Sequence, residues 1–395
     1  MSFFKEKNKI LVTCSKGVAP FLKTELEHLG YPIREEKSLG VFTEGNFADC
    51  YNLNLQLRTG LRVLYLVKEF QARSVDELYK ELFAIRWEDY LYSDGYVSVT
   101  SAVLTDAINN TQFANLKCKD AIVDRMTQKT GRRPDSGPDR NKAVVFLYWK
   151  DDEAAIYLDT SGEPLSKRGY RKIPLKAPMQ EALAAAVVLA TDWKDDGRFI
   201  NPMCGSGTIA IEAALSGLNM APGLLRNNFG FMHLQGYERE EYQTLRKSLR
   251  DRRKNSLSHR IIATDWDAQA VAAAQKNART AGVEQFLEFK VCDFSETLVP
   301  PEKGVIVLNP PYGMRMSEVK ALEEQYKEIG DFFKQKCSGY RGFIFTGNLA
   351  LLKKVGLKSK RRLLFFTGKL EARLVEYELY AGSRKSRGEK DVFEH

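Results

Sequence analysis

The segment FINPMCGSGTIAIEAAL (199–215) constrains the fold more than any other part of the sequence. An apolar stretch that suits a buried strand ends in a loop with two glycines, and an apolar helical pattern begins directly after the loop. Because Gly205 and Gly207 have no Cβ atom, a ligand can approach the backbone of this loop closely. The segment predicts a strand–loop–helix unit with a ligand site at the carboxyl end of the strand, and the alternative for the loop is a plain tight turn.

Strand and helix patterns continue to alternate along the second half of the chain. We expect helices over 179–191, 207–217 and 267–281, strands over 198–201, 260–265, 286–291 and 304–308, and a terminal hairpin over 361–367 and 372–380. Such alternation is typical of a mainly parallel sheet with helices on both faces. The predicted fold class is therefore α/β, a Rossmann-like domain with a terminal hairpin.

The first 160 residues mix short strand and helix patterns, which indicates a compact α+β region. Residues 160–178 hold few core-forming side chains, two glycines, three prolines and five basic side chains, and they predict an interdomain linker. The boundaries that we expect are 1–70 and 71–160 for two α+β domains, 161–178 for the basic linker, 179–381 for the α/β domain and 382–395 for a basic tail.

The composition excludes several classes of protein. The chain has 395 residues, of which 44% are hydrophobic and 28% charged, as expected of a folded protein with more than one core. The longest fully apolar run, 182–190, is shorter than the roughly 20 residues that cross a bilayer. The six cysteines are scattered singly, which argues against a disulfide framework or a structural zinc site. We expect a cytoplasmic protein with reduced thiols, no metal and no membrane contact.

Basic charge is concentrated in the second part of the chain. Residues 1–160 hold 22 basic and 23 acidic side chains, whereas residues 161–395 hold 38 and 28. The formal net charge of +9 favours a polyanionic partner only weakly, since ordinary proteins carry a similar excess.

Carboxylates follow the next two predicted strands. Asp265 ends the strand 260–265, where it can accept two hydrogen bonds from a ribose diol; Asp267 is the nearby alternative, although its position suits a helix cap better. Asp293 follows the next strand and is either an acceptor for an exocyclic amine such as that of adenine or an ordinary turn aspartate. Trp266 is either an adenine contact or a packing residue.

The strand 304–308 leads into the segment NPPYG (309–313), which is a specific motif. Two consecutive prolines hold the backbone extended and cannot donate hydrogen bonds, so a backbone carbonyl points outward as a fixed acceptor. Asn309 adds a side-chain acceptor and Tyr312 adds an aromatic plane. Two acceptors beside a ring suit the exocyclic amino group of a nucleobase.

In this order, NPMCGSG, ATDWD, VCDF and NPPYG resemble the class I S-adenosylmethionine-dependent methyltransferases that methylate amino nitrogens. The segments TSGEPLSKRGYR, APMQEALAAAVVLA and APGLLRNNFGF, with the upstream α+β region, narrow the resemblance to the THUMP-containing RNA guanine-N2 methyltransferases, in the RlmL-like branch that acts on 23S ribosomal RNA. The resemblance covers nearly the whole chain, and LKCKDAIVDRM (116–126) supports its THUMP part. Members commonly have Asp-Pro in place of Asn201-Pro202. They can also carry a second methyltransferase domain after the first, whereas this sequence predicts a single methyltransferase domain.

The resemblance implies the cofactor S-adenosyl-L-methionine, the product S-adenosyl-L-homocysteine and no metal. It also implies that the region 1–70 is ferredoxin-like and that 71–160 is an RNA-binding THUMP domain. The residues that match its cofactor motifs are Asn201, Pro202, Cys204, Gly205, Ser206, Gly207, Thr208, Asp265, Trp266, Asp293 and Asn309. The residues that match its catalytic motif are Asn309, Pro310, Pro311 and Tyr312.

The partner that the resemblance implies is RNA, namely large-subunit rRNA or its assembly intermediate. Candidate phosphate contacts are Lys117, Lys119, Arg125, Lys129, Arg132, Arg133, Lys167, Arg168 and Arg171. Phosphate contacts position a nucleic acid without reading its sequence. The alternative for each of these side chains is an ordinary solvated surface position.

The expected reaction is methyl transfer to the exocyclic N2 amine of a guanosine in 23S rRNA. Acceptors at 309–310 would draw the amine protons, and Tyr312 would stack on a base swung out of its helix. The same motif also serves adenine N6 and tRNA guanine N2, which are the alternatives. A catalytically silent ribosome-assembly factor that binds RNA ranks below them, because Asp265, Asn309 and Tyr312 are all present.

Overall fold

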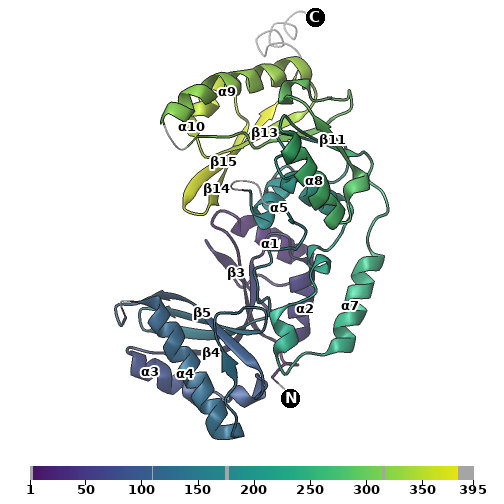
Figure 1. Ribbon diagram of the computed structural model, residues 1–395. Helices are drawn as coiled ribbons and strands as arrows, with labels where there is room; N and C mark the ends of the chain where they lie inside the picture. Colours follow the sequence, from purple (N-terminus) through teal and green to yellow (C-terminus); the bar gives the residue numbers. More distant parts are fainter. Residues whose placement is uncertain (1–2, 109, 174–177, 314–315, 381–395) are drawn as a thin grey trace, which may run out of the picture. The chain divides into compact units, whose positions relative to one another are not determined.

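The chain folds into two compact units in the computed structural model, which describes residues 3–108, 110–173, 178–313 and 316–380. The first unit comprises the residues up to Gly169 together with Met220–Arg253, and the second comprises Tyr170–Asn219 together with the residues from Lys254 onward (Figure 1). The segment 220–253 thus lies between two strands of the second unit in the sequence but folds with the first. The domain boundaries given above stay a prediction, and the basic tail lies outside the described residues.

The first unit is built on one eight-stranded sheet with the order β2-β3-β1-β4-β8-β7-β5-β6. Its strands are β1 (Asn8–Thr13), β2 (Glu35–Lys37), β3 (Gly40–Gly45), β4 (Arg62–Gln71), β5 (Tyr96–Leu104), β6 (Asp135–Ser136), β7 (Ala143–Lys150) and β8 (Glu153–Asp159). Neighbours pair antiparallel except that β5 is parallel to both β6 and β7. The strands β2 and β3 form a hairpin that turns at 38–39.

Four helices accompany this sheet: α1 (Ala19–His28), α2 (Phe47–Gln56), α3 (Val75–Ala84) and α4 (Thr111–Thr130). Local side chains fix where they begin. The Asn46 side chain accepts from the Asp49 amide and the Asp49 side chain accepts from the Asn46 amide, a reciprocal cap at the start of α2. Helix α4 begins after Asn110, whose side chain accepts from the Gln112 amide, and it ends where Gly131 adopts φ +70°.

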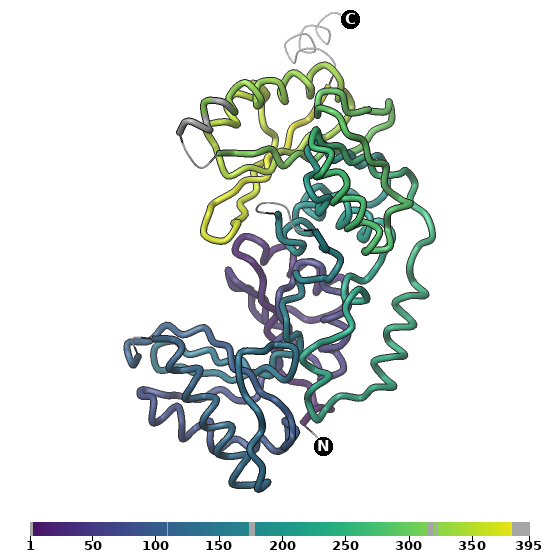
Figure 2. The backbone as a smooth tube through the Cα atoms, viewed as in Figure 1, coloured from purple at the N-terminus to yellow at the C-terminus, as the bar shows by residue number. Residues whose placement is uncertain are grey.

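The segment 220–253 packs on α2 through its helix α7 (Arg239–Asp251) and the short 3-10 turn Pro222–Leu225 (Figure 2). The Tyr51 hydroxyl of α2 donates to the Gly236 carbonyl at 2.9 Å and accepts from the Glu238 amide at 3.0 Å. A Cβ atom at Gly223 would lie 2.5 Å from the Asn54 carbonyl oxygen, so only glycine permits this close approach. These contacts attach the segment firmly to the first unit.

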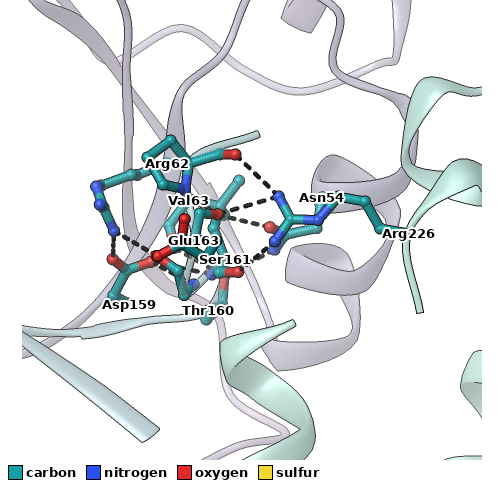
Figure 3. A network of polar contacts seen from close by, with 10 residues as sticks. Asn54, Arg62, Val63, Asp159, Thr160, Ser161, Glu163 and Arg226 are labelled. Atoms are coloured by element: carbon teal, nitrogen blue, oxygen red, sulfur yellow. Dashed lines mark hydrogen bonds and ion pairs between the residues drawn. The ribbon is translucent and has the colours of Figure 1, made fainter. Parts of the chain in front are cut away.

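Arg226 joins the segment 220–253 to a network of polar contacts around Ser161 (Figure 3). Its guanidinium, nearly inaccessible to solvent, donates to the carbonyls of Ser161 at 3.1 Å, Glu163 at 3.0 Å and Pro164 at 3.1 Å. It also lies 4.6 Å over the ring of Phe229. Burial lowers the pKa of Arg226 to about 10, so it stays charged at neutral pH. The guanidinium therefore fastens residues 161–164 to the segment 220–253.

Most of residues 161–170, the first part of the predicted linker, are buried or half-buried. Ser161 and Tyr170 are buried, and Arg168 has only 1% of its surface exposed. Asp159, just before this stretch, is fully buried and pairs with Arg62. Burial raises the pKa of the Asp159 carboxyl, although the charge and hydrogen bond of Arg62 lower it. The predicted linker also includes 174–177, which lie outside the described residues.

The second unit contains a seven-stranded sheet with the order β11-β10-β9-β12-β13-β15-β14. Its strands are β9 (Arg198–Pro202), β10 (Ile261–Asp265), β11 (Leu287–Val291), β12 (Gly304–Leu308), β13 (Arg341–Thr346), β14 (Arg361–Thr367) and β15 (Leu370–Glu378). The first five run parallel, and the hairpin β14–β15, drawn in yellow in Figure 2, extends the sheet in the antiparallel sense. The predicted parallel sheet and terminal hairpin are confirmed.

The helices of this unit are α5 (Glu181–Ala190), α6 (Thr208–Gly217), α8 (Ala268–Thr280), α9 (Met316–Lys336) and α10 (Leu349–Leu352). On one side of the sheet, Ile329 and Phe333 of α9 pack with Ile306 and Ile344 in a continuous core. Helices α5 and α6 pack against each other. Among the described residues, no helix is at once long and apolar enough to cross a bilayer. All six cysteines are unpaired and buried.

We predict that Arg226→Ala destabilises the first unit by about 2–4 kcal/mol, because several buried carbonyls lose their donor. The measurement is urea unfolding followed by the fluorescence of Trp87 and Trp149, both fully buried in this unit. The control is Arg73→Ala, because Arg73 is exposed and pairs with Asp152 at 3.4 Å on the surface, a contact worth less than about 1 kcal/mol. Equal destabilisation by the two substitutions would contradict the anchoring role of Arg226.

Candidate active site

The carboxyl ends of four parallel strands lie in a row at one edge of the second sheet. The strands β11, β10, β9 and β12 are consecutive neighbours, with Asp265 opposite Val291 and Thr264 opposite Pro202. The four sequence motifs follow these strand ends directly. The sheet therefore brings together the segments that the sequence predicts to form one site, and this edge is where open α/β sheets bind ligands.

The glycine loop after β9 is held by its neighbour β10. The Cys204 amide donates to the Thr264 carbonyl at 2.9 Å, and the Gly205 amide donates to the Asp265 carboxylate at 2.9 Å. Gly207 has φ +80°, and a Cβ atom there would lie 2.8 Å from the Cβ atom of Ala274 in α8. Gly205 has φ +55°, but no atom lies within 4 Å of a Cβ added to it. At Gly207 the close packing of α8 requires glycine, whereas at Gly205 the space beside the backbone is open.

Asn201 lies at the end of β9 and bridges to β12. Its side-chain amide donates to the Val307 carbonyl at 2.8 Å, while its Oδ1 atom is buried and accepts no hydrogen bond from the residues that the structure describes. Buried polar atoms almost always have a partner, so an unpaired acceptor at a strand end indicates a place for a ligand donor. Pro202 is buried next to it.

Asp265 is oriented by two backbone amides. Its second carboxylate oxygen accepts from the Asp267 amide at 3.1 Å, and only 9% of the residue is exposed. Asp267 caps α8, as its position predicts, because its side chain accepts from the Gln269 amide at 2.8 Å. Trp266 is 74% exposed and is therefore not a packing residue. Asp265 and Trp266 therefore stay the candidates for ligand contact, whereas Asp267 caps the helix.

Asp293 follows β11 and is exposed. Its carboxylate accepts from the Ser295 amide at 2.9 Å and from the Ser295 hydroxyl at 2.6 Å, which caps the 3-10 turn Phe294–Glu296. The neighbouring Cys292 amide donates to the Asp265 carbonyl at 3.1 Å. The turn role left open by the sequence is present, and the exposed carboxylate still has lone pairs for a ligand.

The NPPY segment (309–312) directly follows β12, and its four residues differ in exposure. Pro310 is buried, Pro311 is exposed, and Asn309 and Tyr312 are half-buried. A Cβ atom at Gly347 would lie 3.1 Å from the Tyr312 ring, and the Asn348 side chain donates to the Tyr312 carbonyl at 3.2 Å. The turn after β13 thus holds the motif in place. Sequence reasoning missed Gly347 and Asn348, for which the only signal was the short segment TGN after an apolar stretch.

Three further loop residues have structural partners. Burial, with a smaller contribution from Asp265, raises the pKa of the Cys204 thiol, so Cys204 is not a thiolate nucleophile. The Thr208 hydroxyl lies 3.4 Å from that of Ser206 and accepts from Arg171 at 3.2 Å. These contacts organise the start of α6.

Three of the predicted RNA-contacting residues are bonded to other groups of the protein, and the other six are half-buried or exposed. Arg168 is buried and donates to the Arg58 and Leu165 carbonyls, so the prediction of a phosphate contact for it is wrong. Arg125 forms a two-pronged ion pair with Glu88 at 2.6 and 3.1 Å. The half-buried Arg171 donates to Met179 and Thr208. The remaining six are half-buried or exposed: Lys117, Lys119, Lys129, Arg132, Arg133 and Lys167.

Two of those six lysines and arginines form ion pairs with nearby carboxylates. Lys119 lies 3.1 Å from Asp120, and Lys167 pairs with Glu163, four residues earlier. Lys117 lies over the Phe113 ring. Their contact with RNA stays a prediction. Among the described residues, no group of three His, Cys, Asp or Glu side chains could hold a metal ion.

The parallel sheet with its antiparallel hairpin and glycine loop defines a class I methyltransferase fold, which confirms the predicted class. The chain belongs to the RMKL-like methyltransferase family, whose domain model matches residues 168–376. The RlmL ferredoxin-like domain model matches residues 9–64, and the THUMP domain model matches residues 72–159. The predicted relationship to THUMP-containing methyltransferases is therefore confirmed.

Individual proteins extend this likeness over nearly the whole chain. The ribosomal RNA large subunit methyltransferase K/L of Syntrophotalea carbinolica is 36% identical over 381 residues, covering 94% of this chain and 53% of the relative. This chain spans about half the length of the curated relatives of that name.

Two solved structures are similar over almost their full length. SMU.472, described provisionally as a methyltransferase and complexed with SAH, is 29% identical with a TM-score of 0.86, covering 96% of this chain and 99% of its own. A Listeria monocytogenes protein described provisionally as an N6-adenine-specific DNA methylase is 30% identical with a TM-score of 0.84, covering 96% and 97%.

We predict that alanine substitutions at the two loop glycines differ in cost. Gly205→Ala should destabilise the second unit by about 1–2 kcal/mol, the penalty of a left-handed backbone conformation alone. Gly207→Ala should cost roughly 1–3 kcal/mol more, because the added methyl group meets Ala274. Thermal unfolding of the two variants and the wild type measures the difference. Equal costs would mean that α8 does not pack against Gly207 as described.

Proposed function

We propose that the chain is an S-adenosylmethionine-dependent methyltransferase that acts on the exocyclic N2 amine of a guanosine in 23S rRNA. The observation that carries the proposal is the position of the NPPY motif, at the end of the strand next to the one that bears the glycine loop. Acceptors for a nucleobase amine thus stand beside a loop that suits the cofactor. The relative named for large-subunit rRNA and the SAH bound to SMU.472 support the substrate and the cofactor respectively.

The residues at the edge of the sheet fit the cofactor. The buried, unpaired Oδ1 atom of Asn201 suits an ammonium donor, and the open space at Gly205 lets a ligand reach the backbone. Asp265 keeps lone pairs for a ribose diol, and the exposed Trp266 ring offers a face to an adenine. The exposed carboxylate of Asp293 can accept from the adenine amine.

The cofactor supplies an electrophilic methyl group on a sulfonium centre. The protein then has to position a nucleophile whose lone pair is delocalised into the purine ring. The Asn309 side chain and the Pro310 carbonyl accept hydrogen bonds from the two N–H groups of the amine, which concentrates the lone pair on nitrogen and directs it toward the methyl group. Tyr312 stacks on the extruded base and offsets part of the few kcal/mol lost on unstacking. The proton released afterwards passes to these acceptors or to water.

RNA is favoured over DNA by the domains that precede the catalytic one. A THUMP domain covers residues 72–159, and the family match places a ferredoxin-like domain before it. The second candidate is adenine-N6 methylation, which the description of the Listeria monocytogenes structure favours and which the NPPY motif serves equally well. Guanine N2 in tRNA is the remaining alternative for the same chemistry.

We predict that Asn309→Ala lowers the rate of methyl transfer roughly 10²–10³-fold, the usual effect of losing one polar contact to the reacting group. Cofactor affinity should stay within a few-fold of the wild type, as measured by isothermal titration with S-adenosylhomocysteine. Asn309→Asp is the matched variant, since it keeps an acceptor and should retain more activity. If Asn309→Ala lost cofactor binding and activity together, Asn309 would be a cofactor residue and its catalytic role would be wrong.

The experiment that tests the whole proposal is mass spectrometry of nucleosides from separately purified rRNA and tRNA, in a strain lacking this protein and in its parent. We expect the loss of one N2-methylguanosine from large-subunit rRNA. Loss from tRNA would keep the chemistry and change the substrate, and loss of N6-methyladenosine would favour the second candidate. No change in any pool would favour a silent assembly factor, and complementation with Asn309→Ala separates that case from a missing protein.

A further inference from the structure

We propose that one face of helix α7 is a binding surface for the phosphate backbone of the RNA substrate. This surface consists of Arg239, Gln243, Arg246 and Arg250 (Figure 1 shows α7). The inference rests on the proposed function in so far as it takes the partner to be RNA. It adds a contact surface in the segment 220–253, which lies outside both the THUMP match and the strand-end motifs.

The four side chains share a face because of their spacing. Intervals of four, three and four residues put them within a narrow stripe of an α-helix, and the stripe runs over roughly 16 Å of helix axis. The adjoining stripe, with Tyr242 and Leu249, is buried, and the Tyr242 ring contacts the Tyr51 ring of α2. The face is therefore fixed in direction by the packing of α7 on α2.

A cavity of about 370 Å³ lies along this face. Its lining comprises Asn227, Met232, Tyr237, Arg239, Tyr242, Gln243, Arg246 and Arg250. Three of these eight residues are arginines, and none carries a carboxylate. A second cavity of about 380 Å³ in the same unit is lined by Asp94, Asp135 and Lys142 among others, so its charges offset one another. Of these two cavities, the one beside α7 has the charge that attracts a polyanion.

The arginines at the two ends of the stripe are available to a partner. Within the part of the chain that the structure describes, neither Arg239 nor Arg250 forms an ion pair, and both are exposed. Arg125 and Arg279, by contrast, are paired with Glu88 and Glu284. Arg239 stands in the first turn, where a cation is unfavourable to the helix dipole, so helix stability gives no reason for its presence.

Arg246 supplies a rigid centre for the stripe. It is 7% exposed, and its guanidinium donates to the Arg226 carbonyl at 3.0 Å, to the Tyr242 hydroxyl at 2.8 Å and to the Leu224 carbonyl at 3.3 Å. The buried charge stays within the cavity wall and adds to the positive potential there. Gln243 and Asn227 provide neutral donors beside it. Two exposed guanidinium groups on either side of a buried one suit consecutive phosphodiesters and carry no base specificity.

The test compares the full-length wild type with the double variant Arg239→Gln/Arg250→Gln. Binding to poly(U) is measured over a series of salt concentrations, and methyl transfer to transcribed 23S rRNA is measured at saturating cofactor. Losing two phosphate contacts on a single strand should reduce the slope of log K against log salt by about 1.4. The KM for rRNA should rise roughly tenfold with kcat unchanged, because a contact made equally in ground and transition states is removed.

The control is Arg34→Gln/Arg73→Gln, which removes the same charge from the same unit at two exposed arginines paired with Glu44 and Asp152. For this control, the slope of log K against log salt should equal that of the wild type. An unchanged slope in the Arg239→Gln/Arg250→Gln variant overturns the proposal, and so does an equal decrease in the control, which would mean bulk charge alone. If the wild type methylates no RNA, the proposed function fails, while the poly(U) slopes still test the surface.

Discussion

The carboxylate of Asp265 joins two neighbouring strand ends, and the rest of the candidate site depends on it. One oxygen accepts from the Gly205 amide in the loop after β9, and the other accepts from the Asp267 amide at the start of α8. Both bonds are charge-assisted and largely shielded from water, which makes them stronger than ordinary loop contacts. The loop is thereby held in the conformation in which Gly207 fits against α8 and Gly205 faces open space. Because β9 also pairs with β12, the NPPY motif is registered against this loop through the sheet itself.

The sequence was sufficient for the parts of the site that depend on local pattern and chain order. A strand pattern followed by a glycine loop or a polar motif predicts where each strand ends, and parallel strands put those ends at one edge. The turn at Gly347 and Asn348 could not be predicted, because its role arises from the pairing of β13 with β12 and from the distance to Tyr312. Arg168 was misjudged for a related reason: its sequence neighbours are polar, and only tertiary packing buries it.

Arginine serves three different purposes in this chain, and only the structure separates them. Arg226 and Arg168 are buried and donate to backbone carbonyls, which ties the residues after β8 to their surroundings. Arg125 is compensated by Glu88, whose pKa it lowers through their hydrogen bonds. Arg239 and Arg250 stay exposed and unpaired among the described residues. A count of basic residues treats all of these alike, which is why the charge excess in the second part of the sequence favoured a polyanionic partner only weakly and did not indicate the helix α7.

Asn201 explains how the site accommodates its departure from the Asp-Pro pattern common in the family. An ionised aspartate could accept a hydrogen bond from a ligand, but it could not donate to the Val307 carbonyl, and its charge would be buried at the end of β9. The asparagine amide does donate there, at 2.8 Å, which joins β9 to β12 while leaving the Oδ1 atom as a neutral acceptor. A neutral acceptor holds a cationic donor less strongly than a carboxylate does. Under the proposed function, part of the cofactor binding would then rest on Asp265 and on the backbone of the glycine loop, while the Asn201 amide secures the strand junction that positions the NPPY motif.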